Sequence, residues 1–269
     1  FIPGIGFLAY NFDDNIVETG SMFIPPDPCG AAGPDRLLAV VNVGIECRDK
    51  GGNLLFRDSL RDFFLPLGAQ TLGTLCFDPK VVFDHHAGRF VVVALERWFT
   101  SAGDPSDESR ILVAVSTSAS PASATAADWY FMAIDSKLNI AGVDHWADYP
   151  GFEVDEEAVY LTMNMFPFSG SGSYTRLWII DKGIGGGFYA GGPVAWSVYG
   201  PIPVGYYHMT LMPALVFGPG GAGPAVGTYL VGYSSLTNGG PGADEFVQVI
   251  RVDNPLALPT FTGEFVNVG

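Results

Sequence analysis

The sequence consists largely of short runs of β-branched, aliphatic and aromatic residues, and this pattern restricts the folds that the chain can adopt. Gly, Pro, Asp and Asn separate the runs, as they do where turns join strands. Helical periodicity is nearly absent, and residues 58–65 are the best candidate for a short helix. The chain is therefore predicted to be all-β, which excludes a parallel α/β sheet and leaves a sandwich, a barrel or a propeller. The predicted strands are Leu37–Asn42, Gly44–Arg48, Val81–Asp84, Phe90–Glu96, Ile111–Ser116, Trp129–Ile134, Ala158–Met163, Arg176–Ile180, Val194–Tyr199, Thr228–Tyr233 and Phe246–Val252.

An internal repeat favours the propeller. Four segments open with related phrases, at residues 26–28, 77–84, 147–155 and, more weakly, 207–214, and about three further strands follow each opening. One four-stranded antiparallel sheet per repeat is the unit of a propeller blade. We expect four blades at about residues 25–75, 76–140, 141–202 and 203–269, alone or within a larger ring. Residues 1–24 are expected to form an N-terminal extension or a ring-closing strand, and paired β-sandwiches are the alternative fold.

The composition of the chain limits the cellular compartment and the binding partners that we expect for it. The chain has 13 Lys and Arg against 28 Asp and Glu, a formal charge of −15, and 48% of its residues are hydrophobic. It can therefore bury a core, and it lacks the basic character that nucleic acids and anionic membranes attract. No apolar run of about 18 residues is present, so membrane insertion is not expected. The 35 Gly and 20 Pro suit a secreted, extracellular or periplasmic protein, and the first residue, Phe1, suggests a trimmed or longer parent chain.

The three cysteines, Cys29, Cys47 and Cys76, fit no zinc or redox spacing. We expect them to be buried free thiols. The alternative is one disulfide, Cys29–Cys76, because both of these residues flank Asp-Pro motifs.

The repeated openings supply the main candidate site. The first strand of each propeller blade lines the central channel, so Asp27, Asp78, Asp148 and His208 are expected to converge around the axis. Asp27, Asp78 and Asp148 could bind Ca²⁺ through hard oxygen ligands, or the group could bind a sugar or a cation. The simpler interpretation is that each Asp caps the turn entering its blade.

Three further candidates lie on the same rim, and a fourth lies beyond it. His145 could form an acid–base pair with Asp144 or Asp148, and Trp146 could stack on a sugar or fill an interface between blades. Tyr207 could face the channel. Glu153 and Asp155 should share one strand face, as a carboxylate pair or a peripheral Ca²⁺ site, although a hairpin turn with solvated charges is the simpler interpretation.

Several phrases resemble a group of secreted bacterial β-propeller proteins that open with a PPDxxGAxGP motif. The matching residues are Ile24–Asp35, then residues 78–84, 111–117 and 148–150, and the resemblance runs from about residue 24 to residue 255. Members are mostly hypothetical proteins, sometimes described as sialidase-like or BNR-repeat-like. The resemblance implies an exported propeller and carries no established activity. The Asp-box of sialidases does not occur, since its nearest echo, residues 116–121 leading to Trp129, lacks the Asp and Gly positions.

Motifs for a nucleophilic serine, a zinc protease or a phosphate-binding loop are absent from the sequence. The sequence therefore favours a binding or structural module of a cell-surface or secreted assembly, with a protein or glycan partner. The alternative is a carbohydrate-active hydrolase or lyase that uses the channel-rim carboxylates and His. Enzymatic activity is left open, with a preference against it.

Overall fold

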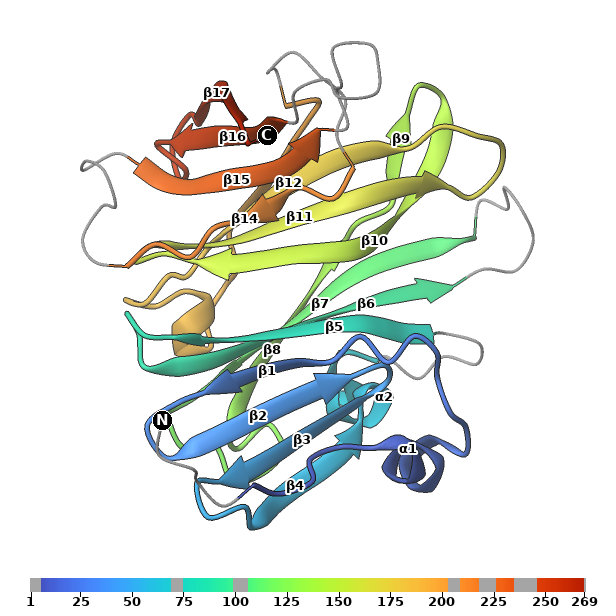
Figure 1. Ribbon diagram of the computed structural model, residues 1–269, viewed down its shortest axis with the longest axis vertical. Helices are drawn as coiled ribbons and strands as arrows, with labels where there is room; N and C mark the ends of the chain where they lie inside the picture. The colour runs from blue at the N-terminus through green and yellow to red at the C-terminus, as the bar shows by residue number, and fades with distance from the viewer. Residues whose placement is uncertain are drawn as a thin grey trace.

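The computed structural model describes residues 6–68, 75–98, 106–202, 209–217, 226–234 and 246–268, which form four antiparallel sheets (Figure 1). Each sheet is built from strands that follow one another along the chain. The strands of the four sheets, in chain order, are β1 (Cys29–Ala32), β2 (Arg36–Val41), β3 (Gly44–Asp49) and β4 (Leu54–Ser59); β5 (Leu75–Asp84), β6 (Arg89–Trp98), β7 (Glu108–Ser116) and β8 (Trp129–Asp135); β9 (Leu138–Ile140), β10 (Val143–Val154), β11 (Ala158–Pro167), β12 (Tyr174–Asp181) and β13 (Trp196–Tyr199); and β14 (Met212–Pro213), β15 (Val226–Ser234), β16 (Phe246–Asp253) and β17 (Thr260–Asn267).

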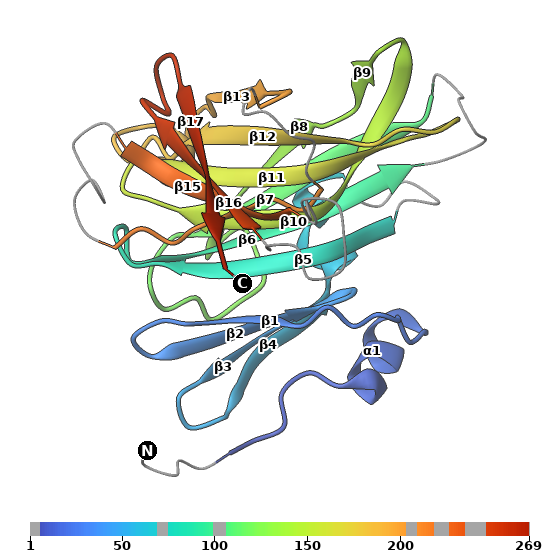
Figure 2. The same ribbon diagram turned by 45° about the horizontal axis from the view of Figure 1, so that its top comes forward.

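These sheets are the four blades of a β-propeller. Neighbouring blades contact one another through β1 and β5, through β5 and β10, and through β10 and β14. The first and fourth blades lie at opposite ends of the long axis, so the blades follow one another as an open arc (Figures 1 and 2). The predicted repeat is present, with four strands in three of the blades and five in the third, where β9 pairs with the start of β10. Isolated sandwich pairs do not describe the fold, because each middle blade packs against two neighbours.

Three buried hydrophobic clusters hold the arc together, one at each interface between blades. Successive side chains along a strand point to opposite faces of the sheet, and in the middle blades both faces carry apolar side chains. One face of each middle blade packs on the blade before it, and the other face packs on the blade after it. On β6, for example, Val92 belongs to the cluster shared with the first blade and Val93 to the cluster shared with the third. The third cluster joins Tyr160 of β11 to Leu230 of β15.

The described part of the N-terminal segment contains a helix. Helix α1 (Phe12–Thr19) begins at Asn11, whose side chain accepts hydrogen bonds from the backbone of the first turn, while Asp14 completes a capping box. It ends at Gly20, which adopts the left-handed conformation with φ of 78°. Of the two alternatives for residues 1–24, residues 12–19 correspond to the N-terminal extension, and α1 lies against β4 of the first blade.

The predicted helix at residues 58–65 is shorter than expected. Strand β4 continues to Ser59, which caps a four-residue helix α2 (Leu60–Phe63), and the 3₁₀ turn η1 (Leu65–Leu67) follows. A second 3₁₀ turn, η2 (Phe188–Ala190), lies between β12 and β13. Within the described part of the chain, no helix is long and apolar enough to cross a membrane.

The thiols of Cys29, Cys47 and Cys76 are free, so the alternative Cys29–Cys76 disulfide is not formed. The Cys29 thiol donates to the Val81 carbonyl at 3.5 Å, and Cys47 donates to the Pro121 carbonyl at 3.7 Å. Burial raises the pKa of both Cys47 and Cys76 to about 12, which keeps these two thiols protonated and inert.

Candidate functional site: a polar line across the blades

Four residues with positive φ mark the same turn in the four blades. They are Asp27, Asp78, Tyr149 and Thr210, with φ of 40°, 49°, 48° and 63°. Asp27 and Thr210 lie two residues before β1 and β14, whereas Asp78 and Tyr149 lie inside β5 and β10, each at a register shift. The predicted equivalence is therefore confirmed for Asp27 and Asp78 but displaced elsewhere: the equivalent residue in the third blade is Tyr149 rather than Asp148, and in the fourth it is Thr210 rather than His208.

The side chain of Asn42 connects the turns of the first two blades. Asn42 follows β2 and is 8% exposed. Its Nδ2 donates to Asp27 Oδ2 at 2.9 Å and to the Pro25 carbonyl at 3.1 Å, and its Oδ1 accepts from the Asp78 backbone N–H at 2.7 Å. One amide group therefore links the carboxylate of Asp27 to the backbone of Asp78.

Asn164 has the same role between the third and fourth blades. It lies on β11, opposite Asp148 in the β10–β11 register. Its Oδ1 accepts from the Thr210 backbone N–H at 2.7 Å, and its Nδ2 donates to Thr210 Oγ1 at 3.0 Å. Between the second and third blades the link is a carboxylate, because Asp78 Oδ2 accepts from the Tyr149 N–H at 3.2 Å. We call this set the polar line: Asp27, Asn42, Asp78, Asp148, Asn164 and Thr210.

At the centre of the polar line, Asp78 and Asp148 form a carboxyl pair. The two carboxyl groups lie close enough together for the charge of Asp78 to act on Asp148. Burial first, and then the nearby charge of Asp78, raise the pKa of Asp148 to about 7, while Arg97 opposes the rise. A fraction of the Asp148 carboxyl groups therefore stays protonated at neutral pH.

Aromatic and cationic side chains surround this pair. Arg97 of β6 lies 3.9 Å from the ring centre of Trp146, and Phe77 contacts the same indole with its ring centre 6.2 Å away. On the other side of Asp148, Lys80 lies 5.3 Å from the ring centre of Tyr149, which is 41% exposed. Trp146 thus fills the interface between the second and third blades, while Tyr149 leaves an aromatic face open beside the carboxyl pair.

The acid–base pair expected for His145 is not formed. His145 is 2% exposed, its Nδ1 contacts the Val143 carbonyl at 2.8 Å, and its ring packs edge-on against Tyr174. Asp144 instead accepts from Asn139 at 2.8 Å. The physical reason is the strand period of two, which places His145 on the opposite face of β10 from Trp146 and Asp148.

Tyr207 and His208 lie outside the described residues. Asp155 caps the β10–β11 hairpin: its Oδ1 accepts from the N–H groups of Glu157 and Ala158, and its Oδ2 accepts from the Tyr160 hydroxyl at 2.6 Å. The turn interpretation of this acidic cluster is correct, although Asp155 is buried. Burial raises the pKa of the neighbouring Glu153 to about 7.

A second buried polar group lies at the other end of the first strands. Asp84, the last residue of β5, caps its hairpin by accepting from the N–H groups of His86 and Ala87, as Asp155 does in the next blade. Its Oδ2 lies 2.6 Å from the Lys182 ammonium, with both side chains fully buried. Lys182 also donates to the Asp155 carbonyl, so one cation joins two blades.

Within the described ranges, no cluster of three or more His, Cys, Asp or Glu side chains is arranged to hold a metal ion. The Ca²⁺ site suggested for Asp27, Asp78 and Asp148, or for Glu153 and Asp155, therefore stays a prediction. Sequence reasoning missed Asn42, Asn164 and Arg97. The two Asn residues occupy similar places in their blades. Asn42 follows β2, which pairs with β1, and Asn164 lies on β11, which pairs with β10.

No protein-family model matches the chain, and no curated protein matches it. Among solved structures, an α-L-arabinanase mutant from Cellvibrio cellulosa is similar with a TM-score of 0.36 and 15% identity, over 84% of this chain and 69% of that one. An exo-1,5-α-L-arabinanase from a bovine ruminal metagenomic library has a TM-score of 0.32 and 12% identity, over 88% of this chain and 96% of that one. Similarity at this level identifies neither a site nor an activity in this chain.

Proposed function

We propose that this protein is an exported carbohydrate-active hydrolase that works through the polar line. The observation that carries the proposal is the Asp78–Asp148 pair, which keeps a proton at neutral pH because burial and mutual repulsion raise the pKa of Asp148 to about 7. A carboxyl group that is still protonated at the working pH is the proton donor that cleavage of a glycosidic bond requires.

A second carboxyl group is also needed, either to activate water or to act as the nucleophile. Asp27 is suited to this role, since it comes from the neighbouring blade and is tied to the Asp78 backbone through Asn42. The amide of Asn42 lies between Asp27 and the backbone of Asp78, so it fixes the position of Asp27 relative to the pair. The exposed ring of Tyr149 supplies a surface on which a sugar ring can stack.

The test is a screen of aryl glycosides and soluble polysaccharides, measured by release of the aryl group or of reducing ends. Asp148→Asn and Asp27→Asn should each lower the rate on any active substrate by about 10²- to 10⁴-fold, the usual effect of losing an acid or base. Asp13→Asn, an exposed carboxyl group of α1, is the matched control and should leave the rate unchanged. If Asp148→Asn hydrolyses as fast as the parent protein, the proposal is wrong.

A second candidate is a binding module that holds a glycan without cleaving it. The close approach of Asp78 to Asp148 favours this alternative, because paired carboxyl groups in glycosidases are separated by about 5–10 Å. A glycan array then shows a ligand that is retained but not cleaved, and Tyr149→Ala weakens its binding. Release of sugar from that ligand by the parent protein would exclude this alternative.

A further inference from the structure

The turn between β2 and β3 carries the amide that joins the first two blades of the polar line. The last pair of the β2–β3 ladder is Val41 with Gly44, so Asn42 and Val43 form the two-residue tip of this hairpin. A residue at such a tip lies beyond the ladder that fixes the strands. Asn164 differs, because it lies within β11 and the neighbouring strands β10 and β12 both hold its backbone. The tip of the β2–β3 hairpin therefore needs other contacts to keep Asn42 in place.

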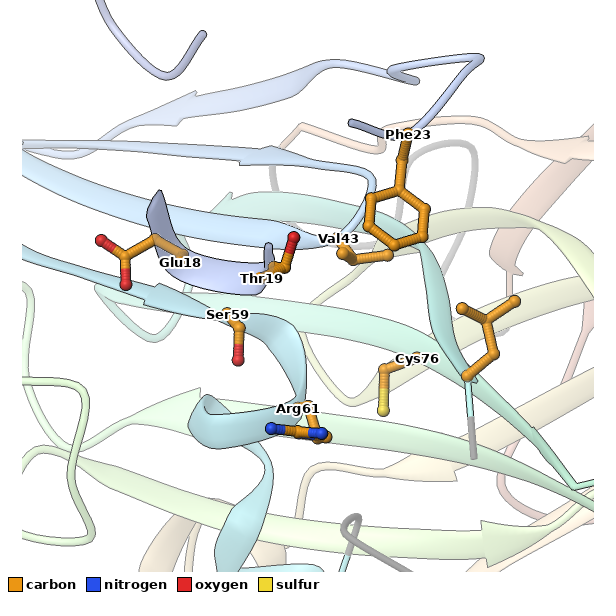
Figure 3. A pocket seen from close by; sticks show the side chains of 8 residues that line it. Glu18, Thr19, Phe23, Val43, Ser59, Arg61 and Cys76 are labelled. Atoms are coloured by element: carbon orange, nitrogen blue, oxygen red, sulfur yellow. The ribbon is translucent and has the colours of Figure 1, made fainter. Parts of the chain in front are cut away.

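Side-chain packing around this tip is incomplete. Val43 belongs to the hydrophobic cluster between the first two blades. It also lines a pocket of about 180 Å³ together with Glu18 and Thr19 of α1 and Cys76 of β5 (Figure 3). A side chain that borders open space lacks part of the contacts that would hold it. Hydrogen bonds therefore decide where the tip lies.

Helix α1 supplies one of these hydrogen bonds. The side chain of Asn15 is 2% exposed, and its Nδ2 donates to the Asn42 carbonyl at 3.0 Å. Two bonds between backbone groups accompany it. The Asn42 N–H donates to the Pro26 carbonyl at 2.8 Å, and the Val43 carbonyl accepts from the Leu60 N–H at 2.8 Å. Of these three bonds, the one from Asn15 can be removed by changing a side chain.

A separate contact holds α1 on the first blade. Asp14, next to Asn15 in the helix, forms an ion pair with Arg57 of β4. Arg57 also donates to the buried carboxylate of Glu46 at 2.8 Å. These charges anchor the helix without the help of Asn15. A substitution at Asn15 therefore tests its contact with the hairpin tip rather than the docking of α1.

We propose that Asn15 is a positioning residue of the candidate site. By holding the Asn42 carbonyl, it keeps the amide of Asn42 where it binds the Asp27 carboxylate and the Asp78 backbone at once. Helix α1 is then part of the site, although it lies outside the four repeated units. The consequence for a reaction rate rests on the proposed function, whereas the effect on Asn42 does not.

The first test needs no substrate. The side-chain amide protons of Asn42 are hydrogen-bonded, and NMR measures their exchange with water once Asn42→Ala has assigned the signal. Asn15→Leu should speed this exchange about fivefold, the effect of losing one ordinary hydrogen bond. Ser136→Ala removes a buried contact of 2.8 Å with the Ser109 hydroxyl in the second blade; it is the matched control and should leave the exchange unchanged. Asn15→Ser keeps a shorter donor, should give an intermediate rate, and replaces Asn15→Leu if that variant does not fold.

The second test uses any substrate that the parent protein hydrolyses. Asn15→Leu should lower kcat about tenfold and change KM less than about twofold, because the reacting groups are displaced while the contacts with substrate remain. The proposal is overturned if a folded Asn15 variant exchanges the Asn42 amide protons at the parent rate, if Ser136→Ala speeds them equally, or if the loss appears in KM alone. Faster exchange in Asn15→Leu, with hydrolysis that Asp148→Asn leaves unchanged, would support the positioning of Asn42 and refute the proposed function.

Discussion

The buried pair of Lys182 and Asp84 makes the most direct test of how the blades are held together. Replacing Lys182 by Met removes the cation and keeps a side chain of similar length. Asp84 then stays buried with no cationic partner, because the Lys182 ammonium at 2.6 Å is the cation that faces it in the described structure. Loss of one partner of a fully buried ion pair costs about 3–5 kcal/mol. The free energy of unfolding of a native domain is about 5–15 kcal/mol, so the variant should remain folded but be clearly less stable than the parent protein.

The matching change at the other end is Asp84→Asn. Its amide oxygen can still accept from the N–H groups of His86 and Ala87, now at 3.0 and 3.1 Å, so the hairpin cap is retained. The variant nevertheless leaves a buried ammonium beside a neutral group, and we expect a comparable loss. The double variant Lys182→Met with Asp84→Asn has neither charge, and it should lose only about 1–3 kcal/mol, mainly through the bond from Lys182 to the Asp155 carbonyl.

Urea unfolding followed by circular dichroism and by tryptophan fluorescence measures these differences, since Trp178 is fully buried in the same interface. The two single losses should add to well above the loss of the double variant, giving a coupling of at least about 2 kcal/mol. Additive losses, or a loss below about 1 kcal/mol for Lys182→Met, would refute the assignment of this pair as the cation bridge between blades.

Three further outcomes follow from the polar line and its surroundings. The folded protein raises the pKa of Asp148 from 3.8 to about 7, so it holds this proton more tightly than the unfolded chain does. The contribution of Asp148 to the free energy of unfolding should therefore be fully present below about pH 4 and be lost as the pH rises through 7. Urea titrations of Asp148→Asn and the parent protein at several pH values should differ by this contribution. Gly151→Ala should lower the free energy of unfolding by about 1–3 kcal/mol, because the new Cβ would lie 2.6 Å from the Leu211 carbonyl oxygen and would also meet Thr162. A melting temperature equal to that of the parent protein would contradict this prediction and show that β10 can move there. If Asp27, Asp78 and Asp148 bind Ca²⁺, adding Ca²⁺ after EDTA should raise the melting temperature by several degrees, about 2–3 kcal/mol at saturating ion, whereas an unchanged melt would leave these groups as hydrogen-bonding partners.

Much of the fold was predictable because strands and turns are local. The run Phe90–Glu96 lies within β6, and the run Ala158–Met163 lies within β11. The long strand β10 was missed because Pro150 and Gly151 interrupt its apolar pattern at a register shift. Helix α1 was missed as well, although Asn11, Asp14 and Gly20 are recognisable caps, because its hydrophobic residues are few and exposed.

The sequence located the repeated turns of the candidate site, but in the third and fourth blades it pointed to a residue next to the equivalent position or near it. The Asp-Pro openings located Asp27 and Asp78 correctly, since the same turn recurs in each blade. Strands β5 and β10 carry the same one-residue register shift, between Phe77 and Lys80 and between Asp148 and Gly151. Pro150 therefore matches Pro79, and the residue before it, Tyr149, matches Asp78. Asn42 was not found because its function depends on the backbone of another blade, a contact between residues far apart in the chain.

The open arc also affects how this molecule can vary. Each blade depends only on its immediate neighbours, as in solenoid proteins, where stability is close to a sum of unit and neighbour contributions. The first and last blades each have one neighbouring blade, whereas the Asp78–Asp148 pair belongs to the interface at the middle of the series. The first blade is tied to this pair through Asn42, whereas the fourth blade has no residue in the pair or in its proposed second carboxyl group. Selection could therefore change the fourth blade, and with it a surface that meets other molecules, while the pair and Asp27 keep their places.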